Sequence, residues 1–240
     1  MKPILVIEQE HPLRGLGLLG ERLEASGLPY RSLRAWDERI EDVGVDDIGA
    51  LIPLGGTAHA WDEDAVPLLR SERLLLEQAV ERDVPVLGIC LGAQVLTRAL
   101  GGDVKRAAQP ERGWLEIMPT VAAADDPLFG HLEEPTGVYQ WHDDVFEPPP
   151  GAQVLAKSAQ VPNQAFRVED TDVWGIQFHP EATPELWELW IARHPVEVAD
   201  SGVDVGALRT AVYAGAEKSL AFRTRFFDAF IDRVRDRWHA

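Results

Sequence analysis

A chain of 240 residues with 45% hydrophobic and 26% charged residues can form one large α/β domain or two small ones, as a soluble globular protein. Its formal net charge of −17 repels the phosphates of nucleic acids and of anionic membranes, so neither is expected as a partner. The single cysteine excludes an intrachain disulfide framework and favours a cytoplasmic location, and without Cys/His clustering neither a metal nor another cofactor is expected.

The first half of the chain alternates short apolar runs with helical patterns, a rhythm typical of a doubly wound, mainly parallel sheet. The expected strands are 4–9, 30–35, 49–56 and 84–89. The expected helices are 15–26, which Gly27 closes, then 67–82 and 93–100. The third strand ends on a double glycine, and the fourth leads directly into the only cysteine.

The pattern changes after residue 102 to short strand candidates that are separated by proline, glycine and acidic turns. These candidates, expected as antiparallel additions to the same sheet, are 114–121, 138–145, 154–158, 163–168 and 174–178. No internal repeat is found. We therefore expect residues 1–183 to form one domain, with 184–240 as a helical extension packed on it.

The C-terminal extension begins with a short helix from Pro184 to about His194. A longer helix is expected from about Val205 to Trp238, with a break near Gly215. One face of the longer helix carries an apolar stripe, made of Phe227, Phe230, Ile231, Val234 and Trp238. We favour a helix docked on the rest of the chain over one that binds a partner.

The segment 88–94 reads Gly-Ile-Cys-Leu-Gly-Ala-Gln and places Cys90 between a buried strand and a helix. Glycines on both sides of a nucleophile are typical of a nucleophile elbow, a strained turn that exposes the reactive side chain. The dipole of the following helix favours the thiolate form of a cysteine in this place. For this segment alone, a buried cysteine that acts as a small hydrophobe is the alternative.

A base for Cys90 is found in the segment 175–181, Gly-Ile-Gln-Phe-His-Pro-Glu. Pro180 is expected to end the strand at His179, at the sheet edge where Cys90 also lies and where open α/β sheets bind ligands. Glu181 can accept a hydrogen bond from the second imidazole nitrogen and fix its tautomer. The double glycine in Leu54-Gly55-Gly56 can provide a backbone donor for an oxyanion, although it can also be a plain turn.

These three segments, in this order, resemble the class I (triad) glutamine amidotransferases over roughly residues 1–185. The resemblance implies a flavodoxin-like α/β fold, with an open, mainly parallel sheet and helices on both faces. It implies that Cys90 attacks the side-chain amide of glutamine, with His179 and Glu181 completing the triad. The backbone N–H groups of Gly56 and Leu91 would then form the oxyanion hole.

The resemblance also implies substrate contacts, although these assignments are looser than the triad. They are Gly55, Gln94 and the segment 139–143, with Trp141, His142 and Asp143, while Glu111-Arg112-Gly113 supports the pocket. The chain departs from many members at Thr57, where they have proline, and this alters the shape of the loop more than the chemistry.

Three functions follow as hypotheses. The first is hydrolysis of glutamine that supplies ammonia to a separate synthase, as in GMP synthetase, of which the Gln-Phe-His-Pro-Glu strand is typical. The second is an independent hydrolase of γ-glutamyl peptides or amines. The third is a non-enzymatic scaffold or sensor, against which the intact Cys90, His179 and Glu181 argue.

Overall fold

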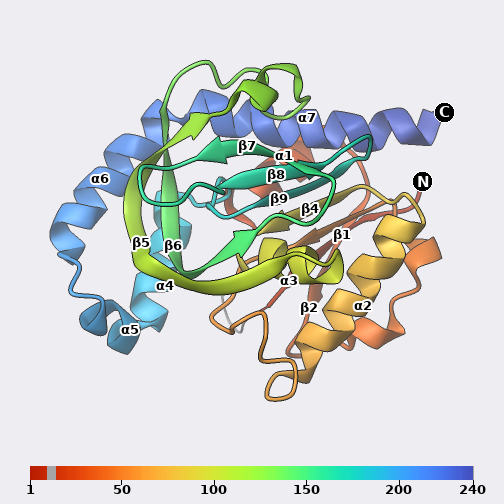
Figure 1. Ribbon diagram of the computed structural model, residues 1–240, viewed down its shortest axis with the longest axis horizontal. Coiled ribbons are helices and arrows are strands. Elements are labelled where there is room, and N and C mark those ends of the chain that lie inside the picture. The colour runs from red at the N-terminus through yellow and green to blue at the C-terminus, as the bar shows by residue number, and fades with distance from the viewer. Residues whose placement is uncertain (10–14, 240) are drawn as a thin grey trace.

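The computed structural model describes residues 1–9 and 15–239 (Figure 1). Within these residues, five parallel strands and four antiparallel strands form one sheet in the order β2-β1-β3-β4-β9-β8-β7-β5-β6. The parallel strands are β1 (Ile4–Glu8), β2 (Tyr30–Arg34), β3 (Ala50–Pro53), β4 (Val86–Ile89) and β9 (Val173–Ile176). The antiparallel strands are β5 (Asp103–Pro119), β6 (Thr136–Glu147), β7 (Ala152–Lys157) and β8 (Ala165–Val168). The predicted fold class is confirmed.

Helices cover both faces of the sheet. They are α1 (Gly17–Ser26), α2 (Pro67–Glu81), α3 (Leu91–Ala99), α4 (Pro184–Arg193), α5 (Pro195–Asp200), α6 (Val205–Lys218) and α7 (Leu220–His239). Short 3₁₀ turns lie at Ile40–Asp42, Val45–Asp47 and Val121–Asp125. Helices α4, α5 and α6 lie beside the β5–β6 hairpin, at the left in Figure 1. No helix among the described residues is long and apolar enough to cross a membrane.

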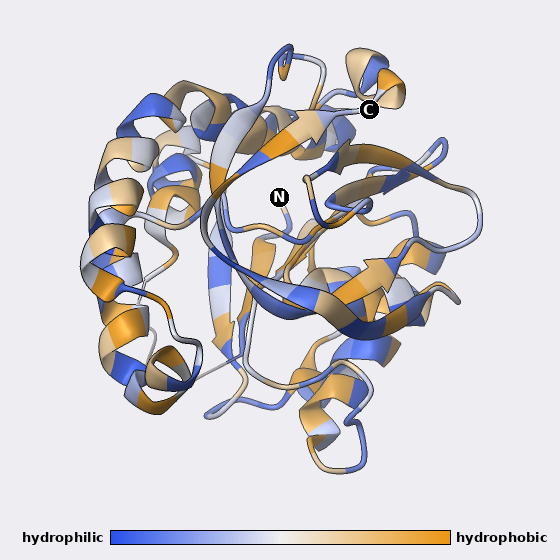
Figure 2. Ribbon diagram, turned by 60° about the vertical axis from the view of Figure 1, so that its left-hand side comes forward, coloured by the Kyte–Doolittle hydropathy of each residue, from blue (hydrophilic) through white to orange (hydrophobic). Residues whose placement is uncertain are grey.

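Strand β1 shows why the central strands are apolar throughout. Ile4 and Val6 are fully buried against α1 and α7, while Leu5 and Ile7 are fully buried on the opposite face against α2. Because both faces of a parallel strand are covered, neither set of alternating residues needs to be polar. The outer helices, by contrast, carry hydrophilic and hydrophobic residues side by side (Figure 2).

Local signals in the sequence set the ends of several helices. Gly27 closes α1 in the left-handed conformation, with φ of 68°, as predicted. The Thr183 hydroxyl caps α4 by accepting from the Leu186 N–H, and Pro184 occupies the first turn. Asp204 caps α6 by accepting from two backbone N–H groups.

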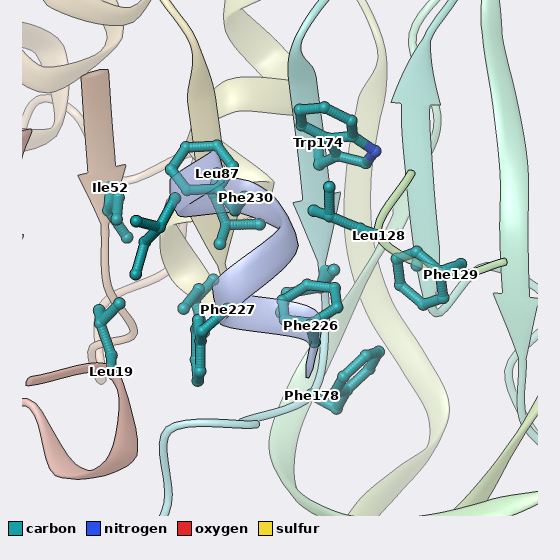
Figure 3. Close-up of a cluster of buried hydrophobic side chains, with 14 of the residues drawn as sticks. Leu19, Ile52, Leu87, Leu128, Phe129, Trp174, Phe178, Phe226, Phe227 and Phe230 are labelled. Atoms are coloured by element: carbon teal, nitrogen blue, oxygen red, sulfur yellow. The ribbon is translucent and has the colours of Figure 1, made fainter. Parts of the chain in front are cut away.

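The apolar stripe of α7 packs into the main hydrophobic core (Figure 3). Phe227, Phe230 and Val234 are fully buried, and the Phe230 ring meets the Trp174 ring edge-on at 6.0 Å. Near the other end of α7, Arg233 and Arg237 donate to the Asp172 carboxylate at 3.0 and 2.6 Å. Helix α7 is therefore held against the rest of the chain at its apolar stripe and at Asp172.

We expect replacement of Phe227 by alanine to lower the free energy of unfolding by about 3–5 kcal/mol, because a fully buried ring leaves a cavity in the core. Urea unfolding followed by circular dichroism measures the effect. Leu220→Ala on the same helix is the control, since Leu220 is 46% exposed, and should change stability by less than about 1 kcal/mol. Equal losses in both variants would contradict the packing of this face.

The C-terminal half differs from prediction in three places. The long helix breaks at Ser219 and not at Gly215, which lies inside α6 so close to Trp114 that a side chain there would collide with the indole. Strand β5 begins at Asp103, earlier than predicted, because its first half forms an exposed hairpin with β6 and needs no apolar pattern. Helix α5 is an additional element.

Candidate active site

Cys90 occupies a strained turn between β4 and α3. Its φ is +52° and its ψ is −110°, a conformation that residues with a side chain rarely adopt. The Cys90 N–H donates to the Ile176 carbonyl at 2.8 Å, and the Cys90 carbonyl accepts from the Gln94 N–H at 3.0 Å. The turn is thus held by β9 on one side and by the first turn of α3 on the other.

The two glycines beside Cys90 permit the close approach of helix and strand. A Cβ atom on Gly88 would lie 2.8 Å from the backbone of Ala93, and one on Gly92 would collide with the Pro53 carbonyl. The spacing Gly-x-Cys-x-Gly therefore has a steric cause at both positions, as expected for a nucleophile elbow.

His179 and Glu181 form a buried pair in the loop after β9. The chain leaves the parallel ladder at Ile176, earlier than predicted, and His179 instead makes an isolated antiparallel bridge with Tyr139 of β6. The backbone N–H of His179 donates to the Tyr139 carbonyl at 2.9 Å. The imidazole Nδ1 lies 2.7 Å from Glu181 Oε1, so the predicted orienting contact is present.

The surroundings of His179 favour its protonated form. Burial lowers the pKa of His179, but the negative charges of Glu181 and of a Cys90 thiolate, with the hydrogen bonds that both make to the ring, raise it to about 10. An imidazolium beside a thiolate is the resting state that a cysteine nucleophile requires, because the thiolate is the reactive form.

The double glycine lies against the reactive groups. A Cβ atom on Gly55 would be 2.8 Å from His179 Cε1 and 3.3 Å from Cys90 Cβ. Gly56 lies beside Leu91, and the Gly92 N–H donates to the Leu54 carbonyl at 3.1 Å, which ties this loop to the elbow. Backbone groups of the loop after β3 and of the start of α3 therefore lie beside Cys90.

A cavity of about 100 Å³ opens beside Cys90, His179 and Glu181. Gly55, Gly56 and Thr57 line one side of the cavity. The other side is apolar and comes from α4, α5 and β6. Its residues are Tyr139, Trp141, Leu186, Trp190, Ile191 and Val198. The Trp190 ring meets His179 edge-on with centroids 5.0 Å apart, so a helix of the C-terminal extension covers the imidazole.

Three residues predicted to bind substrate do not line this cavity. Gln94 Nε2 donates instead to the Asp144 carbonyl and to Gln177 Oε1, both at 3.2 Å. The His142 ring lies 3.0 Å from both the Asp144 carbonyl and Glu111 Oε2, and Asp143 pairs with Arg112. Substrate contact by Gln94, His142 and Asp143 stays a prediction, whereas Gly55 and Trp141 do line the cavity.

Gln177 is a residue of the site that the sequence pattern did not single out. Its Nε2 lies 3.7 Å from Cys90 Sγ, and the bond from Gln94 to its Oε1 fixes which end of the amide faces the sulfur. A signal was present, because Gln177 lies in the Gln-Phe-His-Pro-Glu segment, two residues before His179.

Gln9 and Glu72 form a second contact that the sequence pattern did not single out. Gln9 lines the cavity, packs beside Gly56 and donates to the fully buried carboxyl of Glu72 on α2. The signal was weak: Glu72 falls on the same helix face as Leu69 and Leu76, where an acidic residue needs a partner.

We expect Glu72→Gln to stabilise the protein increasingly as the pH rises. Burial raises the pKa of Glu72 from 4.5 to about 8, against the effect of the Gln9 hydrogen bond. The folded state therefore holds a proton that the unfolded state has lost between these two values, and wild-type stability falls as the pH rises through this window. The variant's advantage should grow by up to about 1.4 kcal/mol per pH unit.

Urea unfolding at about pH 5 and about pH 8 measures this difference. Glu81→Gln on the same helix is the matched control, because Glu81 is exposed. A constant difference for Glu72→Gln would show that this carboxyl titrates normally in the folded protein.

The arrangement suits acyl transfer: a thiol nucleophile, an oriented imidazole and backbone donors meet at one edge of the sheet. Among residues 1–9 and 15–239, no group of three or more His, Cys, Asp and Glu side chains could hold a metal ion.

The family profile of Glutamine amidotransferase class-I matches residues 34–194, about two thirds of the chain, and this range includes Cys90, His179 and Glu181. The chain belongs to this family. The expectation from its sequence motifs is thereby confirmed for the family, and each amidotransferase relative below is a protein that it resembles.

The glutamine-hydrolyzing GMP synthase of Thermosipho africanus is 34% identical over 169 residues, which cover 69% of this chain and 30% of that protein. One subunit of the glutamine-hydrolyzing GMP synthase of Pyrococcus abyssi is 39% identical over 108 residues, covering 45% of this chain and 56% of its own length. This amidotransferase thus spans about a third of the GMP synthases it matches first.

A crystal structure of a glutamine amidotransferase from Methylobacillus flagellatus superimposes with a TM-score of 0.87 at 25% identity. The alignment covers 97% of this chain and 95% of that one, so it extends over the C-terminal helices beyond the family profile.

Proposed function

We propose that this amidotransferase acts in the cytoplasm, where it hydrolyses the side-chain amide of glutamine through a γ-glutamyl thioester on Cys90 and releases ammonia for a separate synthase. The observation that carries the proposal is the strained turn at Cys90 beside the 2.7 Å pair of His179 and Glu181. The family membership supports glutamine as the substrate.

In the first half of the reaction, the Cys90 thiolate attacks the amide carbon and the carbonyl electron pair moves onto oxygen. The backbone N–H groups of Gly56 and Leu91 donate to this oxyanion. The His179 imidazolium gives its proton to the amide nitrogen, the C–N bond breaks, and ammonia leaves. Glu181 keeps Nδ1 occupied, so the proton is transferred from Nε2.

In the second half, neutral His179 takes a proton from a water molecule whose oxygen attacks the thioester carbon. The C–S bond breaks, glutamate leaves, and the thiolate and imidazolium are restored. Each turnover thus consumes glutamine and water and yields glutamate and ammonia, with no net change at Cys90.

A separate acceptor of ammonia is supported by the relatives. One of them is by name only one subunit of its GMP synthase, and other GMP synthases are matched over only about a third of their length. We include a distinct synthase partner in the proposal for this reason, and expect neither nucleic acid nor membrane to bind.

A second function is favoured by one feature of the cavity. Trp190, Ile191 and Val198 place an apolar wall beside the reacting sulfur, and the ammonia that leaves glutamine does not need such a wall. An independent hydrolase of γ-glutamyl amines would bind an apolar amine against it.

Comparison of kcat/KM for glutamine with that for γ-glutamyl amides of aromatic and aliphatic amines distinguishes the two. Preference for glutamine supports the first function. Preference for apolar amides, reduced by Ile191→Trp but not by Leu189→Trp on the exposed side of α4, supports the second. Turnover of neither class would contradict both and favour a sensor.

A further inference from the structure

Helix α7 contributes a buried arginine to the back of the catalytic loop. Arg223 is 2% exposed, and each of its guanidinium nitrogens donates a hydrogen bond. Nη1 donates to the carbonyls of Ala182 at 2.8 Å and Pro180 at 3.1 Å. Nε donates to the Ser219 hydroxyl at 3.0 Å and Nη2 to the Ala216 carbonyl at 2.7 Å, so α6 and the helix break fix the guanidinium.

The two loop carbonyls that Arg223 binds stand on either side of Glu181. The Glu181 carbonyl itself accepts from the Leu18 N–H of α1 at 3.0 Å. The peptide groups around Glu181 are therefore held from two directions, by the backbone of α1 and by one side chain of α7. A hydrogen bond from a charged donor is stronger than one from a neutral donor. The bonds from Arg223 therefore hold these peptide groups more strongly than the bond from the Leu18 N–H does.

The charge of Arg223 also faces that of Glu181. Burial lowers the pKa of Arg223, while the negative charges of Glu181 and Glu21 act in the opposite direction. Glu181 Oε2 is buried and has no hydrogen-bond partner among the described residues, so nearby positive charge is what balances it.

From these contacts we propose that Arg223 is a positioning residue for the acid–base pair: it holds the Glu181 loop so that the carboxylate stays on His179 Nδ1 and the imidazole stays directed at Cys90. Arg223 lies outside the residues that match the family profile. The proposal rests on the function proposed for Cys90, His179 and Glu181, and it adds that a helix of the C-terminal extension sets their geometry.

The main test is Arg223→Lys, which keeps the charge but cannot donate to Pro180, Ala182 and Ala216 together. Arg225→Lys is the matched control, because Arg225 lies on the same helix and is exposed. We expect Arg223→Lys to lower kcat by about 10- to 100-fold with little change in KM, since a small displacement of a catalytic group costs this much. The control should match wild type.

The second readout is the pH dependence of Cys90 alkylation by iodoacetamide without substrate. The midpoint should move to higher pH in Arg223→Lys, because a displaced imidazolium no longer holds the thiolate. Ser219→Ala, which removes the anchor of Nε together with the bond from the same hydroxyl to the Gly215 carbonyl, should give a smaller shift in the same direction. A purely structural role would lower the melting temperature and leave the alkylation midpoint of the folded protein unchanged.

A double-mutant cycle with Glu181→Gln shows whether Arg223 acts through Glu181. In that background Arg223→Lys should have little further effect on kcat. Additive losses, or an unchanged midpoint in both Arg223→Lys and Ser219→Ala, would overturn the proposal. A wild-type protein whose Cys90 is alkylated at low pH, but which cleaves no γ-glutamyl amide, would overturn the proposed function alone.

Discussion

Replacement of Cys90 by alanine is expected to lower kcat for glutamine hydrolysis by at least about 10⁴-fold, because the covalent thioester can no longer form. Residual turnover would come from direct attack of water on the amide, with the oxyanion donors still in place. The fold should persist, since Cys90 is a small buried residue and alanine has the same backbone restrictions at φ of +52°. Ammonia release measures the activity, and thermal unfolding checks the fold.

Labelling with a diazo-ketone analogue of glutamine gives the control for this variant. Wild type should gain one equivalent of label, detected as a single mass increment on the intact protein, and Cys90→Ala should gain none. Label that persists in Cys90→Ala would mean that another side chain is the nucleophile.

Replacement of His179 by alanine is expected to lower kcat by about 10³- to 10⁵-fold, because the same imidazole serves both proton transfers. The change also removes an imidazole whose protonated form is favoured beside Cys90. Cys90 alkylation in the variant should therefore require a higher pH than in wild type, where the pKa of His179 is raised to about 10. Alkylation that is quenched after a fixed time at each pH, and quantified by mass spectrometry, measures this shift.

Glu181→Ala is the graded companion to His179→Ala. Because Glu181 orients the ring through a 2.7 Å contact but does not touch the reacting carbon, its loss should cost less than the loss of His179. His194→Ala, at another histidine that lines the cavity, should leave the alkylation profile unchanged. An equal effect of all three substitutions would argue against a special role for His179.

The strands and the elbow could be predicted because their causes are local. Because both faces of β1, β3 and β4 are buried, these strands are apolar throughout. Glycine is required at positions 88 and 92 because the backbone there approaches a residue close to Cys90 or the neighbouring strand β3. His179 could be predicted because it follows closely after β9 and the carboxyl ends of parallel strands share one edge, although β9 ends at Ile176 and not beside Pro180 as expected.

The contacts that tune the site could not be predicted because they join residues far apart in the chain. Arg223 and Ala182 are 41 residues apart, and Gln94 and Gln177 are 83 apart. The resemblance to the family implied a substrate contact for Gln94, whereas its side chain donates here to the Asp144 carbonyl of β6 and to Gln177. Only the packed structure shows whether such a side chain faces the cavity or the buried polar groups of neighbouring strands.

The packing of α7 has a consequence for protein synthesis. Until the ribosome has released α7, the chain that carries Cys90, His179 and Glu181 lacks Phe226, Phe227 and Phe230 from its core, and α1 lacks the carboxylate of Asp228 that pairs with Arg22 at 2.7 Å. A nascent chain that stops before α7 therefore has the reactive groups without the layer that fixes their loop. We expect glutamine consumption to begin only once this helix has been made, so that truncated translation products release no ammonia.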